Sequence, residues 1–185
     1  AVSRGILGVN QQNLLFVDNG NGTFIERAEF GALQTPTMVW GDFDNDGDPD
    51  LAVGNGWDVA QQNYLYVNNG DGTFTERAEF GTGETLAILW GDFDNDADLD
   101  LAVANQRDSE SYLYVNNGNG TFTGQLQFGT GDLRSISFGS GDCDNDGDLD
   151  LAAGNGNAGE ADQAFLYINN DDGTFTQVAE FGLGG

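Results

Sequence analysis

The sequence contains no histidine, a single cysteine (Cys143) and two prolines. Without histidine, the chain lacks the usual nitrogen ligand of zinc and the usual general base of enzymes. One cysteine can form neither an internal disulfide nor a thiolate cage around a metal ion. Most metalloenzyme and catalytic-triad chemistries are therefore excluded.

Basic residues are also scarce, because five arginines and no lysine stand against 31 acidic residues and leave a net charge of −26. Such a polyanion repels nucleic acid and anionic membrane surfaces. No apolar run is long enough to span a bilayer, and the first residues lack the charged-then-apolar layout of a signal peptide. We expect cations as partners, with no nucleic acid and no insertion into a membrane.

A repeat of about 50 residues dominates what the sequence does contain. Asp42, Asp92 and Asp142 follow one another at intervals of 50 residues, each in the same sequence context. Every repeat holds short segments rich in Val, Leu, Tyr, Phe and Thr, divided by Asn-Gly and Asp-Gly turns. This pattern is typical of successive antiparallel hairpins, and no segment keeps a helical period. Four short strands per repeat predict the blade of a β-propeller.

The sequence therefore predicts an all-β fold, a β-propeller of about four blades, each a four-stranded antiparallel sheet. We place it in one domain, residues 1–185, with units at about 1–31, 32–81, 82–129 and 130–185. The first unit aligns with strands two to four, so that this blade lacks its inner strand and fifteen strands are expected. Both alternating sets of residues in "YLYV" (residues 64–67) are apolar, as in a middle strand covered on both faces.

Acidic residues gather in three loops, because 15 of the 31 lie in "GDFDNDGDPDL" (residues 41–51), "GDFDNDADLDL" (91–101) and "GDCDNDGDLDL" (141–151). Repulsion between carboxylates this close would raise their pKa values or open the loop unless a cation lay among them. Oxygen ligands on a short loop suit a hard cation, and Ca²⁺ tolerates irregular geometry better than Mg²⁺. The sequence predicts three calcium sites.

We expect the first, third, fifth and ninth positions of each loop to ligate through side chains, and the seventh through its backbone carbonyl. The side-chain ligands are then Asp42, Asp44, Asp46 and Asp50, Asp92, Asp94, Asp96 and Asp100, and Asp142, Asp144, Asp146 and Asp150, with carbonyl donors Asp48, Asp98 and Asp148. The sixth position needs a left-handed turn, which favours Gly47 and Gly147 and predicts strain or weak binding at Ala97. An EF-hand is excluded, since position twelve is Val or Ala and not Glu.

The pattern D-x-D-x-D-G-x-x-D-L after an apolar strand, with N-N-G-D-G-T-F further on, resembles the FG-GAP or VCBS-type repeat. Such repeats form the calcium-binding blades of integrin α-subunit propellers and occur in many microbial surface proteins. The resemblance covers nearly the whole chain and implies calcium loops that join the first and second strands on one rim. The departures are Ala97, the missing loop of the first unit and the blade count, because this family usually closes rings of seven.

These features predict a calcium-binding extracellular module that serves adhesion, surface display or self-assembly, and not an enzyme. Calcium is expected to be structural, since each loop is saturated by its own oxygens. The incomplete first blade predicts self-association into an oligomer or a filament. A single cysteine suits a secreted or cell-surface protein in which metal, not disulfides, staples the fold.

Partner contacts are expected in the loops between second and third strands, which vary most between repeats. They hold Trp57, Asp58, Arg107, Asp108 and Glu160. One alternative is a glycan-binding lectin that uses Trp57. A less favoured one is a carbohydrate-active enzyme with a carboxylate pair drawn from Glu84, Glu110 and Glu160.

Five further residues carry expectations of their own. Trp40 and Trp90 precede the first two aspartate loops and are expected in the core or along the central channel, with sugar stacking the less favoured role. Cys143 replaces the Phe43 and Phe93 of the other loops and is expected to be buried. Asn21 and Asn119 match the N-glycosylation pattern, and whether they are modified stays open.

Overall fold

The structure is a computed structural model that describes residues 12–31, 33–76, 80–106, 110–128, 135–155, 164–171 and 174–181. All regular structure in these ranges is β-strand, and none of the described residues forms a helix that could cross a membrane. The all-β prediction is therefore confirmed.

Three four-stranded antiparallel sheets follow the order of the repeats, and we call them the second, third and fourth blades. The second blade holds β3 (Thr37–Gly41), β4 (Asp50–Gly54), β6 (Tyr64–Asn68) and β7 (Phe74–Glu76). The third holds β9 (Thr85–Gly91), β10 (Asp100–Asn105), β11 (Ser111–Asn116) and β12 (Phe122–Phe128). The fourth holds β13 (Ser135–Gly141), β14 (Asp150–Asn155), β15 (Ala164–Asn169) and β16 (Phe175–Phe181).

The first unit contributes a hairpin of two described strands, β1 (Asn13–Asp18) and β2 (Phe24–Phe30). By repeat spacing they correspond to the third and fourth strands of a blade. The second strand predicted for this unit lies in residues 1–11, outside the described part. A short extra sheet of β5 (Gln61–Gln62) and β8 (Thr82–Gly83), which the repeat pattern did not predict, pairs the second and third units.

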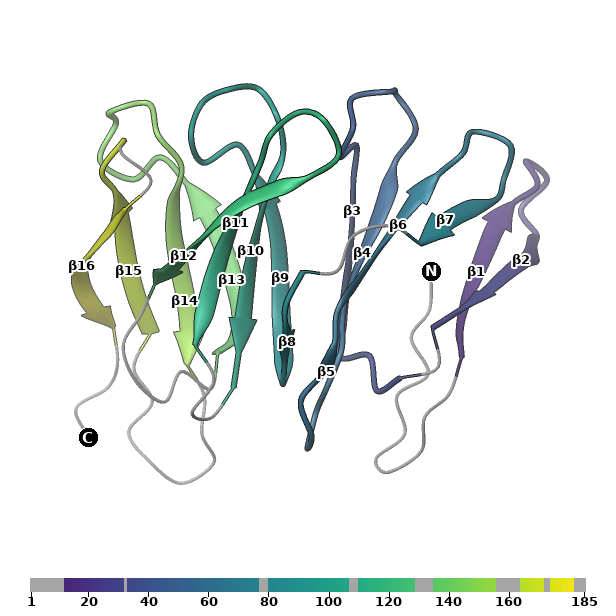
Figure 1. The fold of residues 1–185 in the computed structure, drawn as a ribbon, viewed down its shortest axis with the longest axis horizontal. Coiled ribbons are helices and arrows are strands. Elements are labelled where there is room, and N and C mark those ends of the chain that lie inside the picture. The colour runs from purple at the N-terminus through teal and green to yellow at the C-terminus, as the bar shows by residue number, and fades with distance from the viewer. Residues whose placement is uncertain are drawn as a thin grey trace.

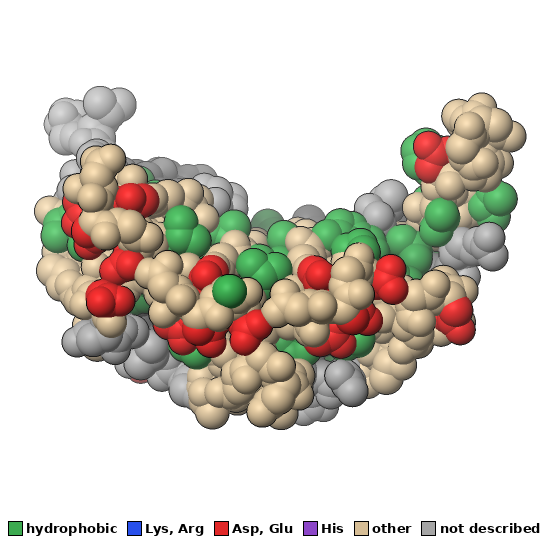
Figure 2. Space-filling model, turned by 90° about the horizontal axis from the view of Figure 1, so that it is seen from above, with side chains coloured by type: hydrophobic (Ala, Val, Ile, Leu, Met, Phe, Trp, Pro, Cys, Tyr) green, Lys and Arg blue, Asp and Glu red, His purple; other side chains and the backbone are tan. Residues whose placement is uncertain are grey.

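The blades stand side by side, and their first strands β3, β9 and β13 contact one another in sequence (Figure 1). Seen from above, the described blades follow a curve that is concave on one side (Figure 2). All three aspartate loops lie at the same edge, the upper one in Figure 1, as the resemblance implied. Acidic side chains accordingly run along this edge in Figure 2.

The hydrophobic core lies between the blades. Phe43, Leu65 and Val67 of the second blade form one buried cluster with Trp90 and residues of the third. A second cluster joins the third blade to the fourth. Tyr66, on the opposite face of the same strand as Leu65, belongs to a third cluster, so the middle strand is covered on both faces as predicted.

The prediction that Cys143 is buried is wrong, because its side chain is exposed. Phe43 and Phe93, the equivalent residues, are buried because each packs against the following blade. Among the described residues no blade follows the fourth, so nothing covers position 143. Its burial depends on a neighbour and not on the residue's place in its own loop.

Candidate metal centre

The aspartate loops connect the first strand of each blade to the second and bring carboxylates together three times. In each loop three side chains offer oxygens that all lie within 4.8 Å of one another. The groups are Asp42, Asp44 and Asp50 in the second blade, Asp92, Asp94 and Asp96 in the third, and Asp142, Asp144 and Asp146 in the fourth. The first and third positions thus meet in every loop, the fifth in two loops and the ninth in one. Of the predicted side-chain ligands, Asp46, Asp100 and Asp150 stand outside these groups.

The ninth aspartate anchors the loop to its blade. Asp50 is fully buried, and its Oδ2 accepts the Phe43 N–H at 2.8 Å while its Oδ1 accepts the Asn68 N–H at 2.8 Å. Asp100 and Asp150 repeat both bonds in their own blades. One carboxylate therefore ties the start of the loop to the end of the third strand. Sequence reasoning assigned these residues only as ligands and missed this role.

The seventh aspartate faces the preceding blade. Asp98 Oδ1 accepts a hydrogen bond from Asn45 Nδ2 at 2.5 Å, and Asp148 accepts one from Asn95. These two side chains are therefore engaged between loops. The asparagine of the fourth position was not predicted as functional, although its presence in all three "DND" segments was a signal.

Backbone conformation explains the residue types at the loop turns. The sixth position has φ values of 93° at Gly47, 106° at Gly147 and 76° at Ala97, so the predicted left-handed turn is confirmed. A Cβ is strained in this region, and Ala97 carries that strain. The fourth-position asparagines share a positive φ, which asparagine tolerates better than most residues. They are Asn45 (56°), Asn95 (59°) and Asn145 (64°).

Burial, hydrogen bonds and neighbouring charges together shift the pKa values of the aspartates at the ninth loop position. Burial raises the pKa of Asp100 to about 6 against the lowering effect of its two N–H bonds, and the charges of Asp94 and Asp96 add to the rise. Burial likewise raises the pKa of Asp50. At Asp150 burial also raises the pKa, but hydrogen bonds from the Cys143 side chain and two backbone N–H groups outweigh it and lower the pKa overall. A bound cation would stabilise the charged form of these carboxylates and so lower their pKa values.

The donor set fits a hard divalent cation. Each group offers only carboxylate oxygens, without nitrogen or sulfur ligands. The loop also wraps around its first carboxylate, since the two Asp42 oxygens accept the N–H groups of Asp46 and Gly47 at 3.1 Å. The residues that meet are thus preorganised on a short turn.

The tryptophans before the loops differ in environment. Trp90 is buried in the cluster between the second and third blades, as expected. Trp40, at the equivalent position, is 40% exposed and lines a cavity. The expectation of core packing therefore holds for Trp90 only.

The remaining candidates lie at the surface or outside the described residues. Trp57 and Asp58 are exposed in the connection between β4 and β5. Glu84 accepts a bond from Gln106 at 2.8 Å, and Glu110 accepts one from the Tyr112 hydroxyl at 2.6 Å. The positions outside the described residues are Arg107, Asp108 and Glu160.

The two positions that match the N-glycosylation pattern belong to exposed hairpin turns. Asn21 Oδ1 accepts both the N–H and the hydroxyl of Thr23, at 3.0 and 2.8 Å. Asn119 makes the same two bonds to Thr121. In both turns the asparagine side chain thus shapes the turn itself.

Comparison with known proteins supports the repeat architecture. The chain matches the FG-GAP-like repeat three times, over residues 6–53, 42–103 and 92–153. No curated protein matches the sequence. Among solved structures, a lectin of Agrocybe aegerita, described in terms of its specific recognition of non-reducing terminal N-acetylglucosamine, superposes with a TM-score of 0.60 at 20% identity. The match covers 92% of this chain and 47% of the lectin chain, so this chain spans about half of it.

These matches cover most of the sequence and agree with the antiparallel blades. They confirm the β-propeller prediction, with several four-stranded blades. At 20% identity, the similarity to the lectin shows a shared fold and nothing further. The chain belongs to the FG-GAP-like repeat family.

Proposed function

We propose that the three aspartate loops bind Ca²⁺ and that the ions are structural. The observation that carries this proposal is the threefold gathering of carboxylate oxygens within 4.8 Å at equivalent places in successive blades. An acidic turn without a metal role would not need the same convergence in each repeat.

Calcium suits these loops better than magnesium. Mg²⁺ demands near-ideal octahedral geometry and holds its waters tightly, whereas Ca²⁺ accepts six to eight oxygens in irregular arrangements. The three groups differ in membership, because Asp50 joins the first while Asp96 and Asp146 join the others. Such variation favours the more tolerant ion.

Binding would stabilise the blade through the residues that hold the loop. The ion offsets repulsion among the carboxylates, while Asp50 links the loop to Phe43 and Asn68 by its two N–H bonds. Because the ligands are dispersed in the unfolded chain, binding free energy contributes to folding free energy. Each filled site is worth about 2.7 kcal/mol when free calcium is 100 times its Kd.

Thermal melts in calcium, in magnesium and in excess EGTA test this proposal. We expect the highest Tm in calcium, the lowest in EGTA, and a smaller calcium effect in Asp44→Asn. Asp71→Asn is the matched control, since Asp71 lies in a hairpin turn where the equivalent residues of two other repeats, Asn21 and Asn119, are asparagine already. A Tm that is the same in calcium and in EGTA contradicts the proposal.

We further propose that the protein works outside the cell as a rigid module for adhesion, surface display or assembly. Calcium sites of extracellular modules typically have Kd values of about 10⁻⁴–10⁻³ M and fill at the calcium levels found outside cells. The exposed Trp57 and Asp58 stand on a connection between strands, where partner contacts on rigid scaffolds are common. Fractionation of the native producer with antibody detection tests the location, and retention of all the protein inside the cell would contradict it.

Self-association through the ends of the arc is part of the same proposal. Phe24 and Ile25 on β2 are 67% and 45% exposed, and Val178 on β16 is 54% exposed. Exposed apolar side chains at the two ends favour contact between copies. Light scattering behind size exclusion should give a mass above 19.7 kDa, and a strictly monomeric protein at all concentrations would contradict this part.

Glycan binding is the second candidate. The fold resembles that of a lectin, and Trp57, with 45% of its side chain exposed, offers a stacking surface for a sugar ring. A glycan array tests this candidate directly. Binding that Trp57→Ala abolishes would favour it, and an array without hits would remove it.

A further inference from the structure

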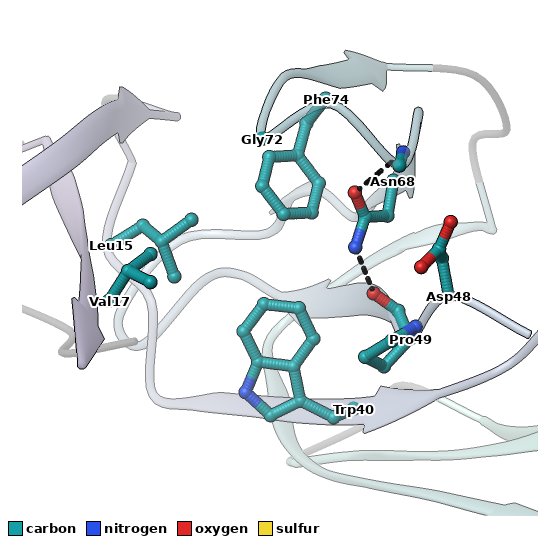
Figure 3. A pocket seen from close by; sticks show the side chains of 9 residues that line it. Leu15, Val17, Trp40, Asp48, Pro49, Asn68, Gly72 and Phe74 are labelled. Atoms are coloured by element: carbon teal, nitrogen blue, oxygen red, sulfur yellow. Dashed lines mark hydrogen bonds between the residues drawn. The ribbon is translucent and has the colours of Figure 1, made fainter. Parts of the chain in front are cut away.

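A cavity of about 490 Å³ lies between the first unit and the second blade (Figure 3). Leu15 and Val17 of β1 form one wall, and Trp40 and Phe74 form the other. The two aromatic ring centroids are 6.1 Å apart. Val17 is 42% exposed and Trp40 is 40% exposed, so this apolar surface lacks a cover among the described residues.

The same four wall positions recur one blade further on, where they are filled. Leu65, Val67 and Trp90 follow Leu15, Val17 and Trp40 by 50 residues, and Phe122 follows Phe74 by 48. The space between these residues is occupied by the ring of Phe43, the second residue of the aspartate loop. Its centroid lies 6.1 Å from that of Trp90 and 5.2 Å from that of Phe122. Exposure falls to 5% at Val67 and 8% at Trp90.

Hydrogen bonds at the edge of this contact also repeat from one junction between blades to the next. Asn116 Nδ2 donates to the carbonyl oxygens of Phe43 at 2.9 Å and Leu99 at 3.2 Å. Asn169 makes the corresponding pair of bonds between the third and fourth blades. At each complete junction the preceding aspartate loop therefore contributes three groups. Its second residue is buried, the carbonyl of that residue accepts a hydrogen bond, and its fourth-position asparagine donates one, as Asn45 does to Asp98.

The cavity presents the residues that, at a complete junction, contact the aspartate loop of the preceding blade. Asn68 Nδ2 donates to the Pro49 carbonyl at 3.2 Å, which corresponds to the bond from Asn116 to Leu99. Within the described part of the chain, no carbonyl of a preceding loop reaches Asn68, and no asparagine donates to Asp48. Both polar groups line the cavity beside Trp40 (Figure 3).

We propose that this cavity receives an aspartate loop of the same repeat type together with the inner strand before it, both supplied from outside residues 1–185. The second residue of that loop is aromatic, and its ring packs between Leu15 and Trp40. Its carbonyl accepts the free hydrogen of Asn68, and the asparagine at the fourth position of the loop donates to Asp48. The added strand takes the place of the inner strand that the first unit lacks, in the manner of donor-strand complementation.

The position of β1 decides that the occupant is a strand with its loop and not a whole blade. Leu15 and Val17 stand where Leu65 and Val67 stand in the second blade, so β1 already holds the place of a third strand. The fourth blade of a second copy would bring its own third and fourth strands into conflict with β1 and β2. Its loop also presents Cys143, which lacks the ring that the cavity fits.

A peptide of residues 35–50 tests the proposal, because it contains β3 and the loop with Phe43 and Asn45. The fluorescently labelled peptide is titrated into the whole chain in calcium and followed by anisotropy. We expect saturable binding that Trp40→Ala weakens at least about tenfold, as for an aromatic anchor. The peptide carrying Phe43→Ala should lose binding to a similar extent. Val59→Ala is the control, since Val59 is 65% exposed and does not line the cavity.

A fusion that places residues 35–50 ahead of Ala1 through a Gly/Ser linker raises the effective concentration of the strand and its loop. Its Tm should exceed that of the unfused chain, and Trp40→Ala should remove the gain. Failure of both the titration and the fusion overturns the proposal. A dimer that Trp40→Ala dissolves would overturn it in favour of a second copy. Displacement of the peptide by N-acetylglucosamine would overturn it in favour of a sugar.

Discussion

Replacing Phe43 by alanine tests whether the contacts between blades hold the arc together. Phe43 is completely buried, and its ring lies within 5.2 Å of Phe122 and 6.1 Å of Trp90 between ring centroids. Removing a fully buried ring costs about 3–5 kcal/mol through lost burial and the cavity that remains. For a chain of this size each kcal/mol lowers Tm by roughly 2–4 °C, so Phe43→Ala should lower Tm by roughly 6–20 °C.

Cys143→Ala is the matched control, because residue 143 has the same place in the fourth blade but is exposed. Urea unfolding, followed by near-ultraviolet circular dichroism, should give a much lower midpoint for Phe43→Ala. Cys143→Ala should lower the midpoint only slightly, because it removes no buried ring and loses only the thiol hydrogen bond to Asp150. The difference should persist in EGTA, since the ring is not a metal ligand. Equal midpoints for the two variants would refute the idea that loop residues stabilise the arc by packing on the next blade.

Further substitutions probe the loops and their junctions. Ala97→Gly should raise the free energy of unfolding by about 1 kcal/mol because it relieves the strain of a left-handed alanine, and Gly47→Ala should lower it by a similar amount; chemical denaturation measures both. Asn116→Ala should cost about 1–3 kcal/mol, since it leaves two backbone carbonyls without their donor, and an unchanged urea midpoint would contradict that role. Asn45→Ala should cost about 1 kcal/mol, and a double-mutant cycle with Asp98→Asn should show coupling between the two residues.

Local features of the fold could be predicted from the sequence because they depend on short stretches of chain. The strand pattern follows from apolar segments divided by Asn-Gly and Asp-Gly turns. The left-handed sixth position follows from the glycine in two of the three loops, and the structure shows it even at Ala97. The meeting of Asp42 with Asp44 is equally local, since alternate residues of one turn can face the same point.

The junctions between blades could not be predicted in this way. Asn45 and Asp98 are 53 residues apart, and only the packing of one blade on the next brings them together. Trp40 and Trp90 share one motif yet differ in burial, and Phe43 and Cys143 differ likewise. Equivalent residues in a repeat have the same local conformation, but their burial depends on whether a neighbouring blade covers that face. The sequence by itself determined the strands, turns and acidic loops. Tertiary packing decided which faces are core and which are surface, and where an added strand with its loop fits.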